Sequence, residues 1–391
     1  MRAEWEDWLP DGTAYRVVVP EAWNGVLLLD LDFIHSPHPP WDDAYASIPA
    51  HGYAVAGTCR PAGAFSASVW AHRLRQVLHP FRQRIGLPER VIALGASDGG
   101  ATARAMEQEL PYSIDGVLAM STPGSGLVSL LNQALDAAFL AKALLAPDDD
   151  DLILAGLPPD VAPVNSRWAA VLDAAQQAPA GQARIALAAD ITRLPCWGVD
   201  ERAAGPPPAH DVDAVQEGYF HELRYLCASG PRLTLRAVVE SLAADLTLVN
   251  EFPRIEPDPV GVEYARESTF DDTLVRPMLF MTTTGDPISP VSNSGPLEAG
   301  ARRAGAGDLL RMCYVRAPGH STFTSAEIGA ALTALTERID DGKWPGTSPD
   351  MMNLRGRYLD PSAARFTDHD PGPGYRPFYA YSEYPGQFRT G

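Results

Sequence analysis

Residues 90–104 read Arg90-Val91-Ile92-Ala93-Leu94-Gly95-Ala96-Ser97-Asp98-Gly99-Gly100-Ala101-Thr102-Ala103-Arg104. The run begins with apolar residues and no polar break, which is typical of a strand buried on both faces of a parallel sheet. Residues 101–110 are rich in helix formers. A glycine-rich turn with Ser97 at its centre separates the two. The pattern predicts a strand, a sharp turn and a helix in direct succession.

Ser97 is the middle residue of a G-x-S-x-G motif. Glycines flank the serine because a Cβ at those positions would clash with the neighbouring strand and helix. Such a turn holds the Ser97 hydroxyl at a helix N-terminus, where free N–H groups favour developing negative charge. A phosphate-binding loop is disfavoured, since the turn lacks a Lys-Ser/Thr pair and a G-x-G-x-x-G pattern. We therefore predict that Ser97 is a nucleophile; the alternative is a structural serine in a tight turn.

The strand, the serine turn and the helix together resemble the nucleophile elbow of the α/β-hydrolase superfamily. The resemblance covers roughly residues 14–123 and 271–343. It implies an α/β fold with a mostly parallel central sheet flanked by helices. It also implies a triad whose members follow in the order Ser, Asp or Glu, His, and it requires no cofactor.

Candidate partners of Ser97 occur in that order. Asp286 follows an expected strand over residues 279–284, in a G-D-x-x-x-P segment where the superfamily keeps the carboxylate that orients the histidine. His320 lies in a Pro-Gly loop just beyond an expected strand over 309–315, where the superfamily keeps its general base. Asp271 and Asp272, upstream of the first of these strands, are the alternative acids.

Two backbone N–H groups are candidates for the oxyanion hole. The resemblance assigns one donor to Asp98, the residue after the nucleophile. The other should follow the strand over 26–31, where the superfamily usually has a His-Gly type loop, but this chain has Asp30-Leu31-Asp32-Phe33. In an extended chain both aspartates lie on one side, so we expect them to point away while the Phe33 N–H donates.

The remaining pattern predicts the sheet and its flanking helices. We expect an N-terminal hairpin over 1–25 and an amphipathic helix over 69–85. A closing helix is expected over 326–339. Further strands are expected over 14–19, 51–58, 114–120 and 275–282.

Three regions follow from this organisation. Residues 1–123 and 271–343 form the hydrolase core. Residues 124–270 do not alternate strand with helix, and they predict an inserted helical cap with helices over 127–145, 169–188, 217–226 and 233–248. Residues 344–391 are rich in Pro, Gly and aromatic residues, which favours a strap over the core surface; a homodimer contact and a cleft wall are the alternatives.

Composition excludes several classes of protein. The 31 Lys and Arg against 49 Asp and Glu give a formal net charge of −18, which disfavours nucleic acid and anionic membrane as partners. No run approaches 18 apolar residues, and the acidic N-terminus lacks an apolar signal core, so we expect a cytoplasmic protein. The four cysteines are widely spaced, which suits free thiols in a reducing compartment.

A metal site is not expected. His35 and His38 have no acidic or cysteine partner at ligand spacing. The four aspartates at 148–151 lack the alternating calcium-loop pattern, so they predict a solvated turn before a helix.

The function predicted from these residues is hydrolysis of a carboxylic ester or lactone through an acyl-enzyme. The apolar helix expected over 127–145 suggests that the small-molecule substrate has an apolar portion. The same triad also serves an aminopeptidase-like amide hydrolase or an acyltransferase. A non-hydrolytic lyase or cyclase and a non-enzymatic receptor are the readings from other classes, since a fold does not fix a function.

Overall fold

The chain folds around one twisted sheet that is parallel over most of its width. The computed structural model describes residues 3–31, 48–59, 66–124, 126–194, 245–253, 255, 259, 269–286, 288–359, 364–372 and 374. Within these residues the sheet has nine strands in the order β1-β2-β4-β3-β5-β6-β7-β8-β9. The strands are β1 Ala3–Trp8, β2 Ala14–Val19, β3 Val26–Asp30, β4 Ala54–Thr58, β5 Arg90–Ala96, β6 Gly116–Met120, β7 Met278–Gly285, β8 Leu310–Pro318 and β9 Phe366–Thr367.

The direction of the strands changes only at the two edges of the sheet. β1 and β2 form the expected antiparallel hairpin, and β2 pairs antiparallel with β4. From β4 through β3, β5, β6 and β7 to β8 every pair is parallel. β9 then adds antiparallel to β8. The predicted fold class, a mostly parallel sheet flanked by helices, is confirmed.

Helices cover both faces of the sheet, and the side chains of each strand alternate between the two. Val91 and Ala93 pack against the face covered by α2 Ala67–Gln76, α3 Leu78–Arg84, α4 Asp98–Glu109 and α11 Gly295–Arg303. Ile92 and Leu94 pack on the opposite face, against α12 Ser325–Asp341 and α13 Pro349–Leu359. This alternation is why the strands read as continuous apolar runs.

The helix expected over 69–85 is two helices. α2 ends at Gln76 and α3 begins at Leu78, so the chain turns at Val77. Pro80 explains the break because proline has no N–H to donate to the carbonyl of Gln76, whereas the first turn of a new helix tolerates it.

Between β6 and β7 the described residues include helices. α5 Leu127–Leu145 has the bounds expected from the sequence, and α6 Ala162–Gln176 and α7 Pro179–Thr192 share a small core with it around Trp168 and Leu172. The single helical stretch expected over 169–188 is interrupted before Pro179, the first residue of α7. Proline is favoured at this position because the N–H that it lacks would have no acceptor within the helix. Residues 245–251 are also helical; the helix expected over 217–226, and 233–248 up to residue 244, lie outside the described residues.

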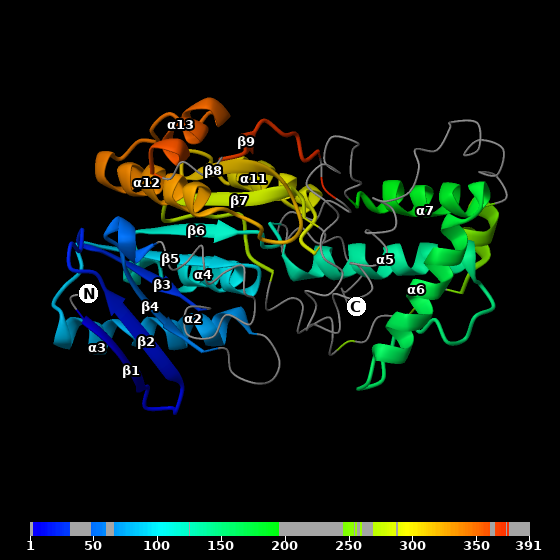
Figure 1. Cartoon of the computed structure of the whole chain (residues 1–391), viewed down its shortest axis with the longest axis horizontal. Coiled ribbons are helices and arrows are strands. Elements are labelled where there is room, and N and C mark those ends of the chain that lie inside the picture. Colours follow the sequence, from blue (N-terminus) through cyan, green and yellow to red (C-terminus); the bar gives the residue numbers. More distant parts are fainter. Residues whose placement is uncertain are drawn as a thin grey trace.

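We call the helices between β6 and β7 the helical insertion. Figure 1 shows α5, α6 and α7 grouped beyond the end of the sheet toward which the β6 arrow points. By length and composition alone α5 is long and apolar enough to cross a membrane, and 50% of its most apolar 18-residue stretch is buried inside the protein. Apolar residues of α5, among them Ala137 and Ala141, pack against α6 and α7.

Two regular elements follow residue 343, where the sequence predicted none. α13 packs on α12 through the fully buried Met352 and through Gly356, at which a Cβ would lie only 3.2 Å from the Ala326 carbonyl oxygen. β9 pairs through Phe366 with Val315 of β8. The tail aromatics from Tyr375 onward lie outside the described residues, so their role as a strap, a dimer contact or a cleft wall stays a prediction.

Candidate active site

Ser97 occupies a strained turn between β5 and α4. Its backbone has φ 54° and ψ −121°, in a region that L-residues rarely adopt. The Ser97 N–H donates to the carbonyl oxygen of Met120 at 2.9 Å, which ties the turn to β6. A Cβ on Gly95 would overlap the backbone of Gly99, and a Cβ on Gly100 would lie 3.0 Å from the same Met120 oxygen. Close approach therefore requires glycine at both positions, and at Gly95 this is the steric reason that the sequence predicted.

Asp286 follows β7 and is completely buried. Its Oδ1 accepts hydrogen bonds from the N–H groups of Ile288 at 2.9 Å and Ser289 at 2.8 Å. These two donors turn the segment after β7 into a tight cap around the carboxylate. They hold the carboxylate in one orientation and partly offset the cost of its burial.

His320 lies in the loop after β8 and directly contacts Asp286. Its Nδ1 is 3.0 Å from both carboxylate oxygens, and its side chain is 15% exposed. The loop is tied to the end of β7, since Thr283 Oγ1 donates to the Gly319 carbonyl at 2.7 Å and the Gly319 N–H donates to the Gly285 carbonyl at 3.2 Å. The sequence placed both residues in this region, but it did not reveal Thr283, whose only signal is a threonine run before Gly285.

Ser97, Asp286 and His320 all lie at the carboxyl ends of the parallel strands. They follow β5, β7 and β8, which run in the same direction and lie in the order β5-β6-β7-β8. Neighbouring strands are about 4.8 Å apart, so the elbow is about 10 Å from β7 along the sheet. The structure thus joins the acid and the histidine and sets the serine on the same edge.

Of the two expected oxyanion donors, the structure describes Asp98 but not Phe33. Asp98 is the first residue of α4, where backbone N–H groups have no partner within the helix, as expected for a donor to an oxyanion. Phe33 lies outside the described residues, as do His35 and His38.

The alternative acids are engaged elsewhere. Asp271 Oδ1 accepts from the Thr273 N–H at 2.9 Å, and Asp272 Oδ2 is 3.0 Å from the guanidinium of Arg303 on α11. Neither contact involves His320, whereas Asp286 touches it directly.

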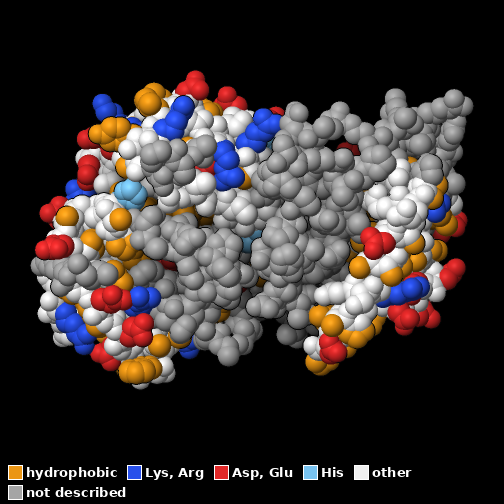
Figure 2. All heavy atoms as spheres, viewed as in Figure 1, with side chains coloured by type: hydrophobic (Ala, Val, Ile, Leu, Met, Phe, Trp, Pro, Cys, Tyr) orange, Lys and Arg blue, Asp and Glu red, His pale blue; other side chains and the backbone are white. Residues whose placement is uncertain are grey.

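Metal-binding groups are not assembled in the part of the chain that the structure describes: no cluster of three or more His, Cys, Asp or Glu side chains is present there. Cys59 and Cys313 are free thiols, and burial raises the pKa of Cys313 to about 12, so this cysteine is a poor thiolate ligand or nucleophile. On the face shown in Figure 2, acidic and basic side chains are interspersed over the sheet domain.

A mostly parallel sheet in this strand order, with a strained serine after β5 and an Asp–His pair after β7 and β8, defines the α/β-hydrolase fold. The chain has that fold, as the sequence resemblance predicted.

Comparisons with known proteins give a relative by sequence and several similar solved structures. No family model matches the sequence. The chain is 28% identical to o-phthalyl amidase of Xanthobacter agilis over 410 aligned positions, which cover 88% of this chain and 89% of the amidase. Similar solved structures include feruloyl esterase B from Aspergillus oryzae, with 13% identity, 87% and 80% of the two chains covered and a TM-score of 0.44. A thermophilic esterase from Thermogutta terrifontis is another, with 16% identity, 86% of this chain and 99% of the esterase covered, and a TM-score of 0.37. The fold and the amidase relative together support a hydrolase.

Proposed function

We propose that this chain is a serine hydrolase that cleaves a carboxylic ester or lactone through an acyl-enzyme on Ser97. The observation that carries the proposal is the contact between His320 Nδ1 and Asp286 at 3.0 Å, on the sheet edge where Ser97 sits. Structural histidines in loops have no need of a fully buried carboxylate behind them.

The roles follow from the hydrogen bonds. As a carboxylate, Asp286 can only accept hydrogen bonds, so it binds the tautomer of His320 that carries its proton on Nδ1. Nε2 is then the acceptor, and it takes the Ser97 proton as the hydroxyl attacks the substrate carbonyl. Asp286 stabilises the imidazolium that results. His320 next gives the proton to the leaving alcohol, and a water molecule repeats the sequence to release the acid.

The negative charge of the tetrahedral intermediate falls near the N-terminus of α4. The N–H groups of Asp98 and Phe33 are the proposed donors, each contributing ~3 kcal/mol to the lowering of the barrier. The proposed chemistry uses no metal and no cofactor.

A second candidate is an amide bond as the substrate. The 28% identical relative is named an o-phthalyl amidase, and its alignment spans most of both chains. The same three residues serve both reactions, because an amide differs mainly in its poorer leaving group, which His320 must protonate before the C–N bond breaks. An apolar part in the substrate, a location in the cytoplasm and the helical insertion as a cap remain predictions from the sequence.

The first test is the reaction of Ser97 with a fluorophosphonate probe, mapped by intact and peptide mass. We expect one adduct, on Ser97, and none in Ser97→Ala. Ser121→Ala is the matched control, because Ser121 also has a positive φ, of 41°, and is fully buried at the end of the neighbouring strand. In this variant the labelling of Ser97 should be unchanged. A folded protein that gives no Ser97 adduct would contradict the proposal and favour the lyase or receptor reading.

Turnover then separates the two substrates. The assay compares a p-nitrophenyl alkanoate, an aliphatic lactone and a monoamide of phthalic acid under the same conditions. Hydrolysis of the first two alone supports the ester or lactone reading. A kcat/KM for the phthalic monoamide that exceeds both others would replace it with the amide reading.

A further inference from the structure

The loop that carries His320 is held in a conformation that it does not prefer. Gly319 has φ 83° and Ser321 has φ 57°, so residues with positive φ flank the histidine on both sides. A serine in this conformation is strained, and such strain persists only where surrounding contacts over-determine the backbone. We call residues 319–324 the histidine loop. Its first residue is fixed by Thr283 and Gly285, which leaves the question of what fixes its other end.

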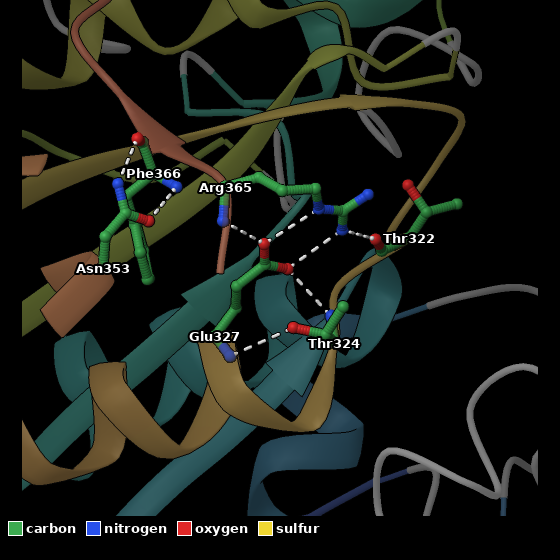
Figure 3. Close-up of polar contacts among 6 residues, drawn as sticks. All are labelled: Thr322, Thr324, Glu327, Asn353, Arg365 and Phe366. Carbon is green, nitrogen blue, oxygen red and sulfur yellow. Dashed lines mark hydrogen bonds and ion pairs between the residues drawn. The ribbon is translucent and has the colours of Figure 1, made fainter. Parts of the chain in front are cut away.

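The other end is held by an arginine from beyond the hydrolase core. Arg365 Nη2 donates to the carbonyl oxygen of Thr322 at 2.7 Å, as Figure 3 shows. The same guanidinium binds Glu327, at the start of α12, through Nε at 3.0 Å and Nη2 at 3.0 Å. A planar guanidinium can reach a carboxylate and a carbonyl at once because its donors are arranged as a fork.

Glu327 connects this arginine to the loop a second time. Its carboxylate is fully buried, and it accepts from the Thr324 N–H at 2.8 Å and from the Arg365 N–H at 2.9 Å. The Thr324 hydroxyl in turn accepts from the Glu327 N–H at 3.3 Å, which completes a capping box. The box alone would only start α12. The bonds to Arg365 and Thr322 add a link that a helix start does not require.

Arg365 owes its place to the strand that the sequence did not predict. The Arg316 N–H of β8 donates to the Arg365 carbonyl at 2.8 Å. The Asn353 side chain of α13 bonds both backbone groups of the next residue, Phe366, at 2.8 and 2.9 Å. The backbone of Arg365 is therefore fixed from two elements, so its side chain meets the histidine loop at a defined point.

We propose that Arg365 and Glu327 are positioning residues that hold His320 in line with Asp286 and Ser97. The proposal rests on the proposed function, because it assigns these residues to the general base of that reaction. It also gives the C-terminal segment a role in turnover. The two ends of the histidine loop are then anchored independently, one by the acid strand β7 and one by Arg365.

The test uses Arg365→Lys with Arg355→Lys as its matched control. Lysine keeps the positive charge beside Glu327 but has a single ammonium in place of the fork, so it loses the bond to Thr322. Arg355 forms the same kind of pair with Glu337, at 2.6 and 2.8 Å, and likewise links the C-terminal segment to α12. Its partner lies on a later turn of the same helix. Both lysine variants should weaken a link between the same parts of the protein, and only one touches the histidine loop.

The expected result is specific to proton transfer. A shift of about 1 Å in a catalytic group can lower a rate about 100-fold, so we expect Arg365→Lys to reduce kcat for an alkyl ester or amide by roughly 10- to 100-fold with little change in KM. The loss should be smaller for a p-nitrophenyl ester, whose leaving group needs no proton from the histidine. Arg355→Lys should stay within about twofold of the wild type on both substrates. Equal losses in the two variants, or an equal loss on both substrates, would overturn the proposal.

Labelling of Ser97 separates this inference from the function beneath it. If the wild type gives no fluorophosphonate adduct on Ser97, the proposed function fails and the inference falls with it. If the wild type is labelled and Arg365→Lys is labelled at the same rate, only the inference fails. Should Arg365→Lys not fold, Glu327→Gln and Glu337→Gln form a second matched pair, of which only the first should slow labelling.

Discussion

Asp286→Asn is the substitution whose effect the structure defines most sharply. The Oδ1 atom of Asp286 accepts two backbone N–H groups, at 2.9 and 2.8 Å, so an asparagine must place its carbonyl oxygen there. Its NH₂ group then occupies the position of Oδ2, 3.0 Å from His320 Nδ1. That NH₂ is a donor, so Nδ1 loses one of its two acceptors and keeps only the Oδ1 carbonyl, which is also 3.0 Å away and already accepts two backbone N–H groups. A donor that faces Nδ1 favours the tautomer with its proton on Nε2, and that tautomer cannot accept the Ser97 proton.

The magnitude follows from the cost of turning the amide over. The flipped amide would point its NH₂ at two buried backbone donors and lose both of their bonds, at about 1–3 kcal/mol for each unsatisfied group. Even 2 kcal/mol leaves only a few per cent of molecules in the productive orientation. Exchange of this aspartate for asparagine in a Ser-His-Asp triad lowers kcat by about 10⁴. We expect a loss of that size, with the two backbone bonds and the fold retained.

The assay is kcat/KM for a p-nitrophenyl ester, together with the rate of fluorophosphonate labelling and a urea melt. Asp115→Asn is the control, because Asp115 also accepts a backbone N–H, that of Val91 at 2.8 Å, but at the amino-terminal ends of β5 and β6, away from the site. It should leave turnover unchanged. An Asp286→Asn enzyme within threefold of wild-type kcat would refute the assignment of Asp286, and a large loss in Asp271→Asn would point to the alternative acid.

Three further substitutions test how the site is supported. Gly95→Ala should cost at least about 3 kcal/mol of stability and abolish activity, because its Cβ would overlap the Gly99 backbone; a normal thermal melt would contradict this. Burial raises the pKa of the Glu107 carboxyl above its usual 4.5, so the folded state binds the proton more tightly, and this contribution to stability is lost as pH rises through the folded pKa. Urea melts should therefore show Glu107→Gln gaining on the wild type between about pH 4 and pH 7, and a pH-independent difference would count against the raised pKa. Gln133→Leu should lower the free energy of unfolding by about 2–4 kcal/mol, because the Asn293 amide loses a buried acceptor at 2.6 Å; a change below about 0.5 kcal/mol in a urea titration would contradict it.

The elbow and its order of partners could be predicted from sequence because they depend on local chemistry. Gly95 is fixed by steric contact with the Gly99 backbone, two residues beyond Ser97, and that local constraint leaves a direct trace in the motif. Asp286 and His320 each follow an apolar strand, and parallel strands bring their carboxyl ends to one edge whatever lies between them. The 150 or so residues that separate Met120 from Met278 therefore did not hide the pairing.

The C-terminal contacts could not be predicted because they depend on partners far along the chain. β9 is only two residues long, Phe366–Thr367, too short for any periodic pattern. α13 has just two buried positions, Met352 and Gly356, spaced one turn apart, so its sequence reads as irregular. The break before Pro179 is different: proline was visible there, but alanine-rich residues on both sides favour helix, and only packing shows that two helices meet at this point.

The helix that presents Ser97 also holds both crossings between the sheet and the helical insertion. Arg104 of α4 donates to the carbonyls of Pro123 and Gly124 at 3.0 Å, where the chain leaves the sheet, and its guanidinium stacks 4.6 Å over the ring of Phe270, where the chain returns. Burial lowers the pKa of Arg104 to about 10, so the guanidinium keeps its charge at neutral pH.

One turn further along α4, Glu107 Oε1 accepts the N–H groups of Val275 and Arg276 at 2.5 and 2.9 Å, just before β7. A displacement of the insertion at either crossing would therefore act on α4, whose first residue supplies the proposed Asp98 donor. A buried charge that loses its partners is costly, so these contacts oppose small shifts of α4 relative to the two crossings. The sequence shows Arg104 and Glu107 as two ordinary helix residues, and their common task emerges only when chain segments about 150 residues apart meet on one helix face.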